Sequence, residues 1–444
     1  MFGTLVRPIQ RFFKLEAASG VLLLAAAVAS LIWANQSAAT FERVFGLRLQ
    51  IGVGTVSLAF SVRELVNDGL MTLFFFVVGM EIKRELVLGE LRTFGRAALP
   101  AVAALGGMLV PAGVYLAFNP SGPAHHGWGI PMATDIAFSI GVLTLLRKRV
   151  PQGLVVFLTA LAIFDDIGGI LVIALFYGQR LHILWMAAAA AVALMIFVAG
   201  RRSVAHGVFY LVAGALLWYC LHESGIHATI SGVVLGLAIP GRLSHSPREV
   251  LRELTRHTQG LMEQTAEVDP DAVSMIRDRL EQLASPLARF IHRMHPLVAF
   301  CIMPAFALAN SGIPLRGMGA ALTAEVALGT ALGLLLGKPI GIFIFTVVAV
   351  RAGLAPIPGG ASAVKLLGTA AVGGIGFTVA IFIASLAFSA DASLLNEAKL
   401  GILLGSLASG VLGAAILRAT PLLSTYRGGL QSQPTSTHSS VASV

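Results

Sequence analysis

Twelve apolar stretches recur along the 444-residue chain, and they restrict its fold more than any other feature. A transmembrane helix needs about 20 mostly apolar residues, which is close to the length of these stretches. Hydrophobic residues make up 56% of the chain and charged residues only 12%, about half the fraction usual in soluble domains. We therefore predict an all-α polytopic membrane protein with about twelve transmembrane helices. The stretches lie near residues 17–34, 65–82, 97–118, 129–146, 153–177, 181–199, 206–221, 226–240, 296–313, 324–350, 364–388 and 399–417.

Basic residues lie mainly between the apolar stretches, so a lipid bilayer explains the net charge of +9 better than a nucleic-acid partner does. If the N-terminus is cytoplasmic and the stretches alternate in direction, 24 of the 31 Lys and Arg residues fall on the cytoplasmic side and six on the outer side. Cytoplasmic loops of membrane proteins are enriched in Lys and Arg. We therefore expect both termini to lie in the cytoplasm.

The chain divides into a membrane domain and two terminal segments. Residues 1–16 are expected in the cytoplasm or at the membrane interface, residues 17–420 form the transmembrane domain, and the Ser- and Thr-rich residues 421–444 form a disordered tail. A cleavable signal peptide is the alternative for the first stretch, but cleavage would put the next segments on the wrong side. Within the domain we predict an outer β-hairpin near 44–60 and a charged cytoplasmic loop at 241–293.

Four charged residues lie near the middle of the apolar stretches, where a charge costs about 2.5–3.5 kcal/mol on insertion scales. They are Asp135, the adjacent pair Asp165 and Asp166, and Lys338. Neighbouring helix positions point about 100° apart, so one carboxylate of the pair can face a water-filled path while the other faces a neighbouring helix. Carboxylates that take up protons and offer hard oxygen ligands suit exchange of a proton for a small cation. The alternatives are a structural ion pair or a tolerated polar pair for the aspartates, and a snorkelling helix-end lysine for Lys338.

Glycine and proline interrupt two of the stretches. Gly129 and Pro131 precede Asp135 in the fourth stretch, and residues 373–376 of the eleventh hold three glycines. Broken helices leave unpaired carbonyls and half-helix dipoles that bind or compensate ions, whereas plain helix packing is the alternative for the glycines. Three-span units that begin at 97 and at 324 carry these interruptions at similar positions and run in opposite directions. This order predicts an inverted repeat, which is typical of transporters.

Other patterns indicate a pH-sensitive role or a scaffold. Glu81, Arg84 and Glu85 share one helix face at the cytoplasmic end of the second stretch, and His227 begins the eighth. The alternatives are a solvated ion-pair cluster and an interfacial histidine. Small residues at 329, 333, 337 and 341 and at 401, 405, 409 and 413 predict close helix packing. The two cysteines lack metal-site spacing, and no cofactor is expected.

Four motifs together resemble the NhaA-type bacterial sodium–proton antiporters, over residues 10 to 420. They are FVVGMEIKRE at Phe76–Glu85, MATDIAF at Met132–Phe138, LAIFDDIG at Leu161–Gly168 and GKPIG at Gly337–Gly341. The resemblance implies twelve helices with inverted repeats and two interrupted helices in the bacterial inner membrane. It also implies electrogenic, pH-regulated exchange of cytoplasmic Na⁺ or Li⁺ for external H⁺ in sodium and pH homeostasis.

The resemblance further implies roles for individual residues in the ion site. Asp165 and Asp166 would carry protons and bind the transported Na⁺ or Li⁺. Thr134 and Asp135 would belong to the crossed broken helices beside them. Lys338 would compensate the charge of Asp165.

The resemblance implies regulation and assembly as well. Glu81, Arg84, Glu85 and His227 would respond to pH, and the outer hairpin would join two copies in a homodimer. The chain departs from the family at His292, which follows Ile291 where an acidic residue is expected, and in its longer 241–293 loop. These departures concern regulation and leave the transport core intact.

Three other functions fit the sequence less well. Coupled uptake of an organic solute would need a further charged or aromatic cluster as its binding site. An intramembrane aspartyl protease needs two aspartates that face each other across a site, whereas Asp165 and Asp166 are adjacent on one predicted helix. A passive channel would not need so costly a pair without a selectivity ring. The sequence therefore favours an ion antiporter.

Overall fold

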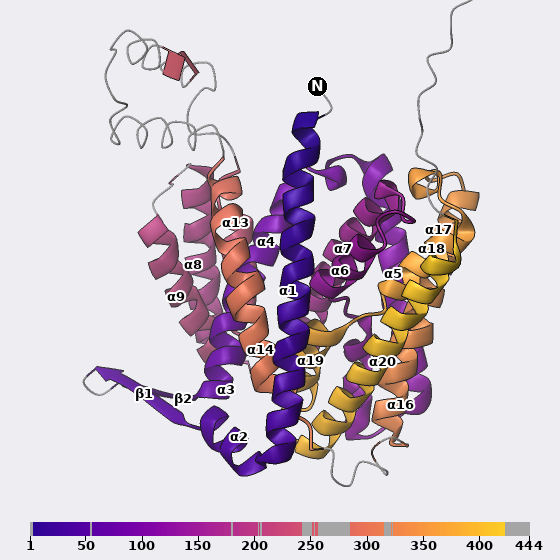
Figure 1. Ribbon diagram of the computed structural model, residues 1–444. Coiled ribbons are helices and arrows are strands. Elements are labelled where there is room, and N and C mark those ends of the chain that lie inside the picture. Colours follow the sequence, from indigo (N-terminus) through magenta and orange to yellow (C-terminus); the bar gives the residue numbers. More distant parts are fainter. Residues whose placement is uncertain are drawn as a thin grey trace, which may run out of the picture.

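Figure 1 shows the protein as a computed structural model in which helices dominate. The structure describes residues 3–53, 56–178, 181–202, 204, 207–241, 251–252, 254–255, 285–314, 321 and 323–421. Among these residues, nine helical segments are long and apolar enough to cross a membrane, and the bent pair at 363–372 and 377–387 makes a tenth if it counts as one span. The predicted all-α polytopic membrane fold is confirmed.

The label η marks segments of 3₁₀ or π geometry. In the N-terminal part they are α1 (Gly3–Gln36), α2 (Ala38–Phe45), β1 (Arg48–Val53), β2 (Val56–Ser61), α3 (Val62–Glu64), η1 (Leu65–Leu70), α4 (Met71–Val87), η2 (Glu90–Arg92), α5 (Phe94–Phe118), η3 (Pro123–Met132), α6 (Ile136–Leu145) and α7 (Gln152–Phe176). In the C-terminal part they are α8 (Ile183–Arg201), α9 (Gly207–Ser224), α10 (Ile230–Ala238), α13 (Pro286–Leu297), η4 (Val298–Ile302), α14 (Met303–Asn310), α16 (Glu325–Leu332), η5 (Gly333–Gly337), α17 (Lys338–Arg351), η6 (Pro358–Gly360), α18 (Ala363–Val372), α19 (Phe377–Ala387) and α20 (Ala392–Ala419).

The predicted hairpin near 44–60 is present at residues 48–61. β1 and β2 pair antiparallel, with Arg48 opposite Ser61 and Val53 opposite Val56. The hairpin projects from one end of the molecule beside α2, and we call this the hairpin end (Figure 1). Most of the predicted loop at 241–293, and the tail from residue 422, lie outside the described residues.

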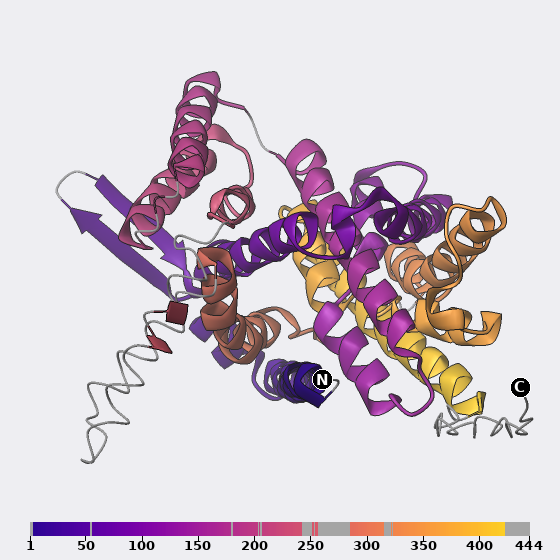
Figure 2. The ribbon, with the colours of Figure 1, turned by 90° about the horizontal axis from the view of Figure 1, so that it is seen from above.

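Two groups of helices form the body of the protein (Figure 2). α4, α8, α9, α10, α13 and α14 make one group, and α5, α6, α7 and α16 to α20 make the other. α1 contacts both groups. The Ser30 hydroxyl of α1 donates to the Leu308 carbonyl of α14 at 2.7 Å, and Gly20 of α1 lies against the Ala137 carbonyl of α6.

Close backbone contact holds the second group together, and it requires glycine. A Cβ on Gly106 of α5 would stand 2.4 Å from the Gly341 carbonyl oxygen of α17, and a Cβ on Gly341 would stand 2.1 Å from the Gly106 carbonyl oxygen. No larger residue fits at either position. The small-residue stripe at 329–341 therefore packs against a neighbouring helix, as predicted.

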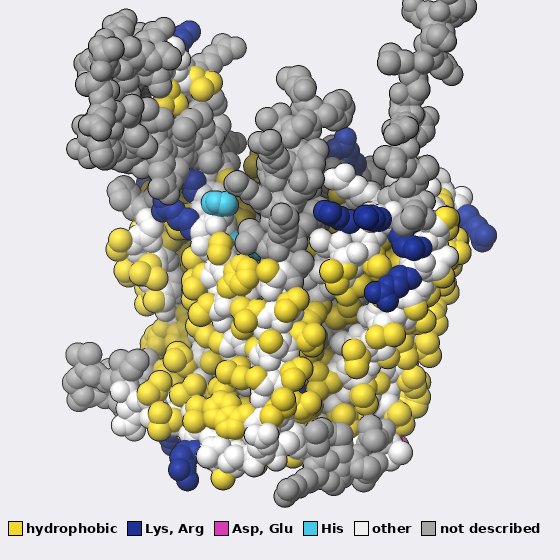
Figure 3. All heavy atoms as spheres, viewed as in Figure 1, with side chains coloured by type: hydrophobic (Ala, Val, Ile, Leu, Met, Phe, Trp, Pro, Cys, Tyr) yellow, Lys and Arg dark blue, Asp and Glu magenta, His cyan; other side chains and the backbone are white. Residues whose placement is uncertain are grey.

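Apolar side chains cover the sides of the molecule, as Figure 3 shows for one face. On α8 and α9, Leu184 is 80% exposed and Val208 is 74% exposed. Lys and Arg side chains in this view gather mainly at the end away from the hairpin. An exposed apolar surface of this extent marks contact with lipid.

The two short apolar stretches at 206–221 and 226–240 are separate helices, α9 and α10. The chain turns between them at Gly225, which has a φ of +84°, a left-handed value that favours glycine. α10 is only nine residues long and lies against α4, where a Cβ on Gly79 would stand 2.6 Å from the Val233 carbonyl oxygen. α10 alone is therefore too short to cross a bilayer.

Candidate functional site

Both predicted interruptions are present, and they cross in the interior of the second helix group. Residues 133–135 are extended between η3 and α6, and residues 373–376 separate α18 from α19, whose axes differ by 48°. The backbone N–H of Asp135 donates to the carbonyl of Ile375 at 2.6 Å. Four helix ends therefore meet at one place, and their unpaired backbone groups need partners there.

Side-chain hydroxyls cap the end of α18. Each of the three carbonyls that precede or begin the break lies within hydrogen-bond distance of a buried Ser or Thr. These pairs are Ser409 with Ala371 (2.7 Å), Ser139 with Val372 (3.1 Å) and Thr134 with Gly373 (3.0 Å). The hydroxyls come from α20, α6 and the extended segment at 133–135.

Ser406 of α20 caps the start of α19 on the other side of the break. Its hydroxyl oxygen accepts the backbone N–H groups of Gly376 and Phe377, both at 3.2 Å. Ser406 and Ser409 lie three positions apart on α20, so one helix supplies partners to both sides of the break. The sequence did not single out these caps, because Ser409 was interpreted only as part of a packing stripe.

Asp135 joins the N-terminal ends of α6 and α19. Its Oδ1 accepts the N–H of Phe138 at 3.2 Å, while its Oδ2 accepts the N–H of Thr378 at 3.1 Å and the Thr378 hydroxyl at 2.5 Å. A helix N-terminus carries roughly half a positive charge. The carboxylate of Asp135 is thus compensated by two helix ends and fully hydrogen-bonded within the fold.

Lys338 forms a buried ion pair with Asp165. Nζ of Lys338 lies 2.8 Å from Oδ2 of Asp165, and both side chains are 0% exposed. The ammonium also donates to the carbonyl of Met132, at the end of η3. The Thr134 hydroxyl reaches the same Oδ2 at 2.7 Å, whereas the buried Oδ1 of Asp165 has no hydrogen-bond partner in the described part of the chain.

Asp166 lies one position further on α7 and faces a different environment. It is 6% exposed and lines a narrow cavity of about 80 Å³, together with Thr134, Asp135, Glu81 and His295. Among the described residues no hydrogen bond or ion pair engages its carboxylate. Since Asp135 is balanced by helix ends and Asp165 by Lys338, the buried site retains one uncompensated carboxylate. Such a carboxylate matches the charge of a single monovalent cation or proton.

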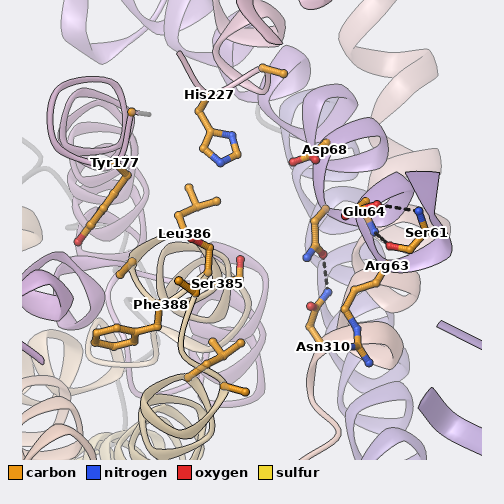
Figure 4. A pocket seen from close by; sticks show the side chains of 18 of the residues that line it. Ser61, Arg63, Glu64, Asp68, Tyr177, His227, Asn310, Ser385, Leu386 and Phe388 are labelled. Atoms are coloured by element: carbon orange, nitrogen blue, oxygen red, sulfur yellow. Dashed lines mark hydrogen bonds between the residues drawn. The ribbon is translucent and has the colours of Figure 1, made fainter. Parts of the chain in front are cut away.

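A larger cavity of about 890 Å³ opens at the hairpin end, and Asp165 and Asp166 do not line it. Figure 4 shows that Asp68, His227 and Ser385 lie around it. Phe382, which is wholly buried, lies on α19 between Thr378 at the carboxylate site and Ser385 in this cavity. The Phe382 ring contacts Phe75 at 5.4 Å, Phe306 at 6.2 Å and His227 at 6.1 Å between ring centroids. This aromatic cluster, defined by Phe75, Phe306 and Phe382, borders His227, which lines the large cavity.

The residues expected to respond to pH lie in two places, three on α4 and one in the large cavity. Glu81, Arg84 and Glu85 lie near the end of α4 away from the hairpin, where Arg84 pairs with Glu85 at 3.2 Å. The Oε1 of Glu81 lies 3.9 Å from Nε2 of His295 on α13. His227 lies instead in the turn before α10, in the large cavity (Figure 4). Sequence reasoning missed His295, since its place beside Glu81 depends on how α13 packs against α4.

Comparison with known proteins identifies close relatives. The sequence model of the family described as Na⁺/H⁺ antiporter 1 matches residues 10–417. The Na(+)/H(+) antiporter NhaA of Anaeromyxobacter sp. (strain Fw109-5) is 57% identical over 429 residues, which cover 96% of this chain and 94% of the relative. The Na(+)/H(+) antiporter NhaA 1 of Myxococcus xanthus (strain DK1622) is 56% identical over 422 residues, 94% of each chain. The Na(+)/H(+) antiporter NhaA of Syntrophobacter fumaroxidans is 42% identical over 448 residues, 98% of this chain and 93% of the relative.

Proposed function

Because this chain belongs to the Na⁺/H⁺ antiporter 1 family, we propose that it exchanges Na⁺ for H⁺ across a membrane. The observation that carries the proposal is the Asp166 carboxylate, which is buried and faces a narrow cavity without a partner among the described residues. Burial of a charge is costly, and a bound cation or proton offsets that cost. The names of the three relatives above agree with this exchange.

The ligands for Na⁺ in this proposal are oxygens of Asp165, Asp166 and Thr134. Carboxylate and hydroxyl oxygens are the hard ligands that small cations of this type prefer. Asp165 offers the unpaired Oδ1, and Thr134 lies 2.7 Å from the other oxygen of the same carboxylate. The same carboxylates also bind protons, so a proton and a sodium ion compete for them. Lys338 supplies the positive charge beside Asp165, and Asp135 supplies the negative charge between the two helix N-termini, so both charges stay in place while Na⁺ and H⁺ compete.

The path of the ions follows from the two cavities. The narrow cavity would admit cytoplasmic Na⁺ to Asp166, while the aromatic cluster of Phe75, Phe306 and Phe382 closes the way to the hairpin end. Rocking of the two helix groups would then open the large cavity to the site and close the narrow one. The hairpin end would therefore face outward, and both termini would lie in the cytoplasm, which the distribution of basic residues supports.

We extend the proposal to the energetics and the physiological role of the exchange. Two adjacent carboxylates offer two proton positions for each sodium ion, so unequal exchange and net charge movement follow, and the proton gradient drives Na⁺ out. Li⁺ has the same charge and hard character and would share the site. Located in the bacterial inner membrane, such an exchanger serves sodium and pH homeostasis.

Regulation and assembly complete the proposal. Glu81, Arg84 and Glu85 would adjust access to the narrow cavity with pH, because Glu81 lines it. His227 would act at the opposite cavity, where it lines the wall. The hairpin would pair with that of a second copy, since β1 and β2 project away from the helices (Figure 1).

Sodium-dependent proton movement in everted membrane vesicles tests the exchange. The Asp166→Asn variant should fold but show no proton movement on addition of Na⁺ or Li⁺, because the amide neither binds the proton nor balances the cation. Glu397→Gln on α20 is a matched control, since Glu397 is a carboxylate that lines neither cavity and contacts Ser393 at 3.5 Å. Wild-type proton movement in Asp166→Asn would overturn the proposed function.

A further inference from the structure

The Thr134 hydroxyl stands between two acceptors. Its oxygen lies 2.7 Å from Oδ2 of Asp165 and 3.0 Å from the carbonyl oxygen of Gly373. Thr134 is 1% exposed and Asp165 is 3% exposed, so water does not compete freely for these groups. A hydroxyl carries one hydrogen, and an ionised carboxylate and a carbonyl only accept. Thr134 can therefore satisfy one of the two acceptors at a time.

The Gly373 carbonyl depends on Thr134 more than its neighbours depend on their own hydroxyls. The Ala371 carbonyl accepts a backbone N–H from Gly374 as well as the Ser409 hydroxyl. The Val372 carbonyl likewise accepts a backbone N–H in addition to the Ser139 hydroxyl. Within the described residues, Thr134 is the single donor to the Gly373 carbonyl. The end of α18 is therefore fully capped only when Thr134 turns toward it.

When no sodium is bound, the Thr134 hydroxyl donates its hydrogen bond to Asp165. Hydrogen bonds to ionised acceptors are shorter and about twice as strong as bonds between neutral groups, and the 2.7 Å distance is the shorter of the two. The Gly373 carbonyl then lacks its donor. Since the break in α18 and α19 crosses the one beside Asp135, this unfilled position lies at the centre of the crossed helix ends.

Sodium reverses the preference of the hydroxyl. A cation held by Asp165 and Asp166 attracts the lone pair of the Thr134 oxygen and repels its hydrogen. The Gly373 carbonyl is the other acceptor within reach. We infer that Thr134 turns its hydrogen from Asp165 to the Gly373 carbonyl when Na⁺ occupies the carboxylates, so that ion binding completes the cap of α18. The inference rests on the proposed exchange of Na⁺, and the movement is a rotation of the hydroxyl in which no proton is transferred.

This contact lets Thr134, a proposed ligand of Na⁺, couple the ion site to the broken helix. Asp165 and Asp166 lie on α7, whereas Gly373 ends α18, and the hydroxyl touches both parts. Occupied and empty sites thereby differ in the number of hydrogen bonds at the helix break. A difference of this kind allows the bound ion to bias one arrangement of the helices over another.

Solid-state NMR of the full chain in proteoliposomes reads the Gly373 carbonyl directly. Glycine labelled with ¹³C at the carbonyl and with ¹⁵N gives one-bond carbon–nitrogen signals only at Gly-Gly peptide bonds, which occur at 106–107, 168–169, 359–360, 373–374 and 428–429. Gly373→Ala, whose added Cβ would meet nothing nearer than 3.1 Å, removes one signal and so identifies it. Spectra are compared in NaCl and in choline chloride, with ²²Na⁺ binding measured on the same samples.

The wild-type Gly373 carbonyl signal should move downfield in saturating NaCl, as gain of a hydrogen bond requires. Thr134→Ser, which keeps the hydroxyl, should show the same shift, and Thr134→Val should show none. Ser139→Ala is the matched control, because it removes the neighbouring cap without touching Asp165, and it should retain the shift. A shift in Thr134→Val, or bound ²²Na⁺ without any wild-type shift, overturns the inference and leaves the exchange standing. Absence of ²²Na⁺ binding in the wild type overturns both.

A second variant keeps the inference testable if Thr134→Val binds no sodium. Asp165→Leu combined with Lys338→Met removes the carboxylate acceptor together with its buried partner, so no unpaired charge is left. Thr134 then has the Gly373 carbonyl as its acceptor. The Gly373 signal should already lie at the sodium-bound position in choline chloride. A signal at the sodium-free position of the wild type would contradict the inference.

Discussion

Replacement of Lys338 by methionine should destabilise the protein more than any other single lysine change. The Lys338 and Asp165 side chains are both 0% exposed and lie 2.8 Å apart, so water does not screen their interaction. Removal of one partner of a buried ion pair leaves an uncompensated charge and costs about 3–5 kcal/mol. Methionine keeps the volume of the lysine stem, so a cavity adds little to this cost. The hydrogen bond to the Met132 carbonyl is lost as well.

Two further variants separate the charge effect from a general effect of lysine removal. Lys399 on α20 is 7% exposed, but no ion pair engages it in the described residues, so Lys399→Met should cost little. Lys338→Met combined with Asp165→Leu removes both charges and should recover most of the lost stability. Thermal unfolding ranks the stabilities of these variants. All scans use one detergent and one scan rate, because the melting temperature of a protein that unfolds irreversibly depends on the scan rate. A melting temperature of Lys338→Met equal to that of Lys399→Met would refute the reasoning.

Two other substitutions test the helix break and the aromatic cluster. Ser406→Ala leaves two buried N–H groups without an acceptor, at about 1–3 kcal/mol each, so it should lower the melting temperature, whereas Ser406→Thr should not. Ser385→Ala is the control, since the Ser385 hydroxyl donates to the Phe382 carbonyl of its own helix. An equal fall in melting temperature in Ser406→Ala and Ser385→Ala would contradict the capping role. Phe382→Ala should speed the decay of a pH gradient across sodium-free proteoliposomes, because we propose that this wholly buried ring closes the way between the carboxylates and the large cavity. An unchanged rate of decay would show that this ring is not the barrier.

The sequence predicted the membrane fold and the chemically unusual residues because both leave strong local signals. Apolar runs reveal helices in lipid, and the cost of a buried charge makes Asp165, Asp166 and Lys338 conspicuous. The 100° angle between neighbours predicted that the two aspartates would face different surroundings, and they do. Glycine and proline located the breaks at 129–135 and 373–376.

The partners of the broken ends could not be predicted, because they come from residues far apart in the chain. Thr134 and Gly373 are 239 positions apart, and Ser139 and Val372 are 233 apart. A serine that caps a helix break has the same appearance in a sequence as a serine that allows close packing, as Ser409 illustrates. The Ser409 hydroxyl caps the Ala371 carbonyl because α18 and α20 lie side by side in the fold.

Competition between Na⁺ and H⁺ for the buried carboxylates is the central claim, and calorimetry tests it most directly. Sodium is titrated into the purified protein in buffers with different enthalpies of ionisation, so that the heat reports the number of protons released. Wild-type protein should release protons as Na⁺ binds, and Asp166→Asn should lose that release. Sodium binding without proton release at every pH at which exchange proceeds would contradict the claim.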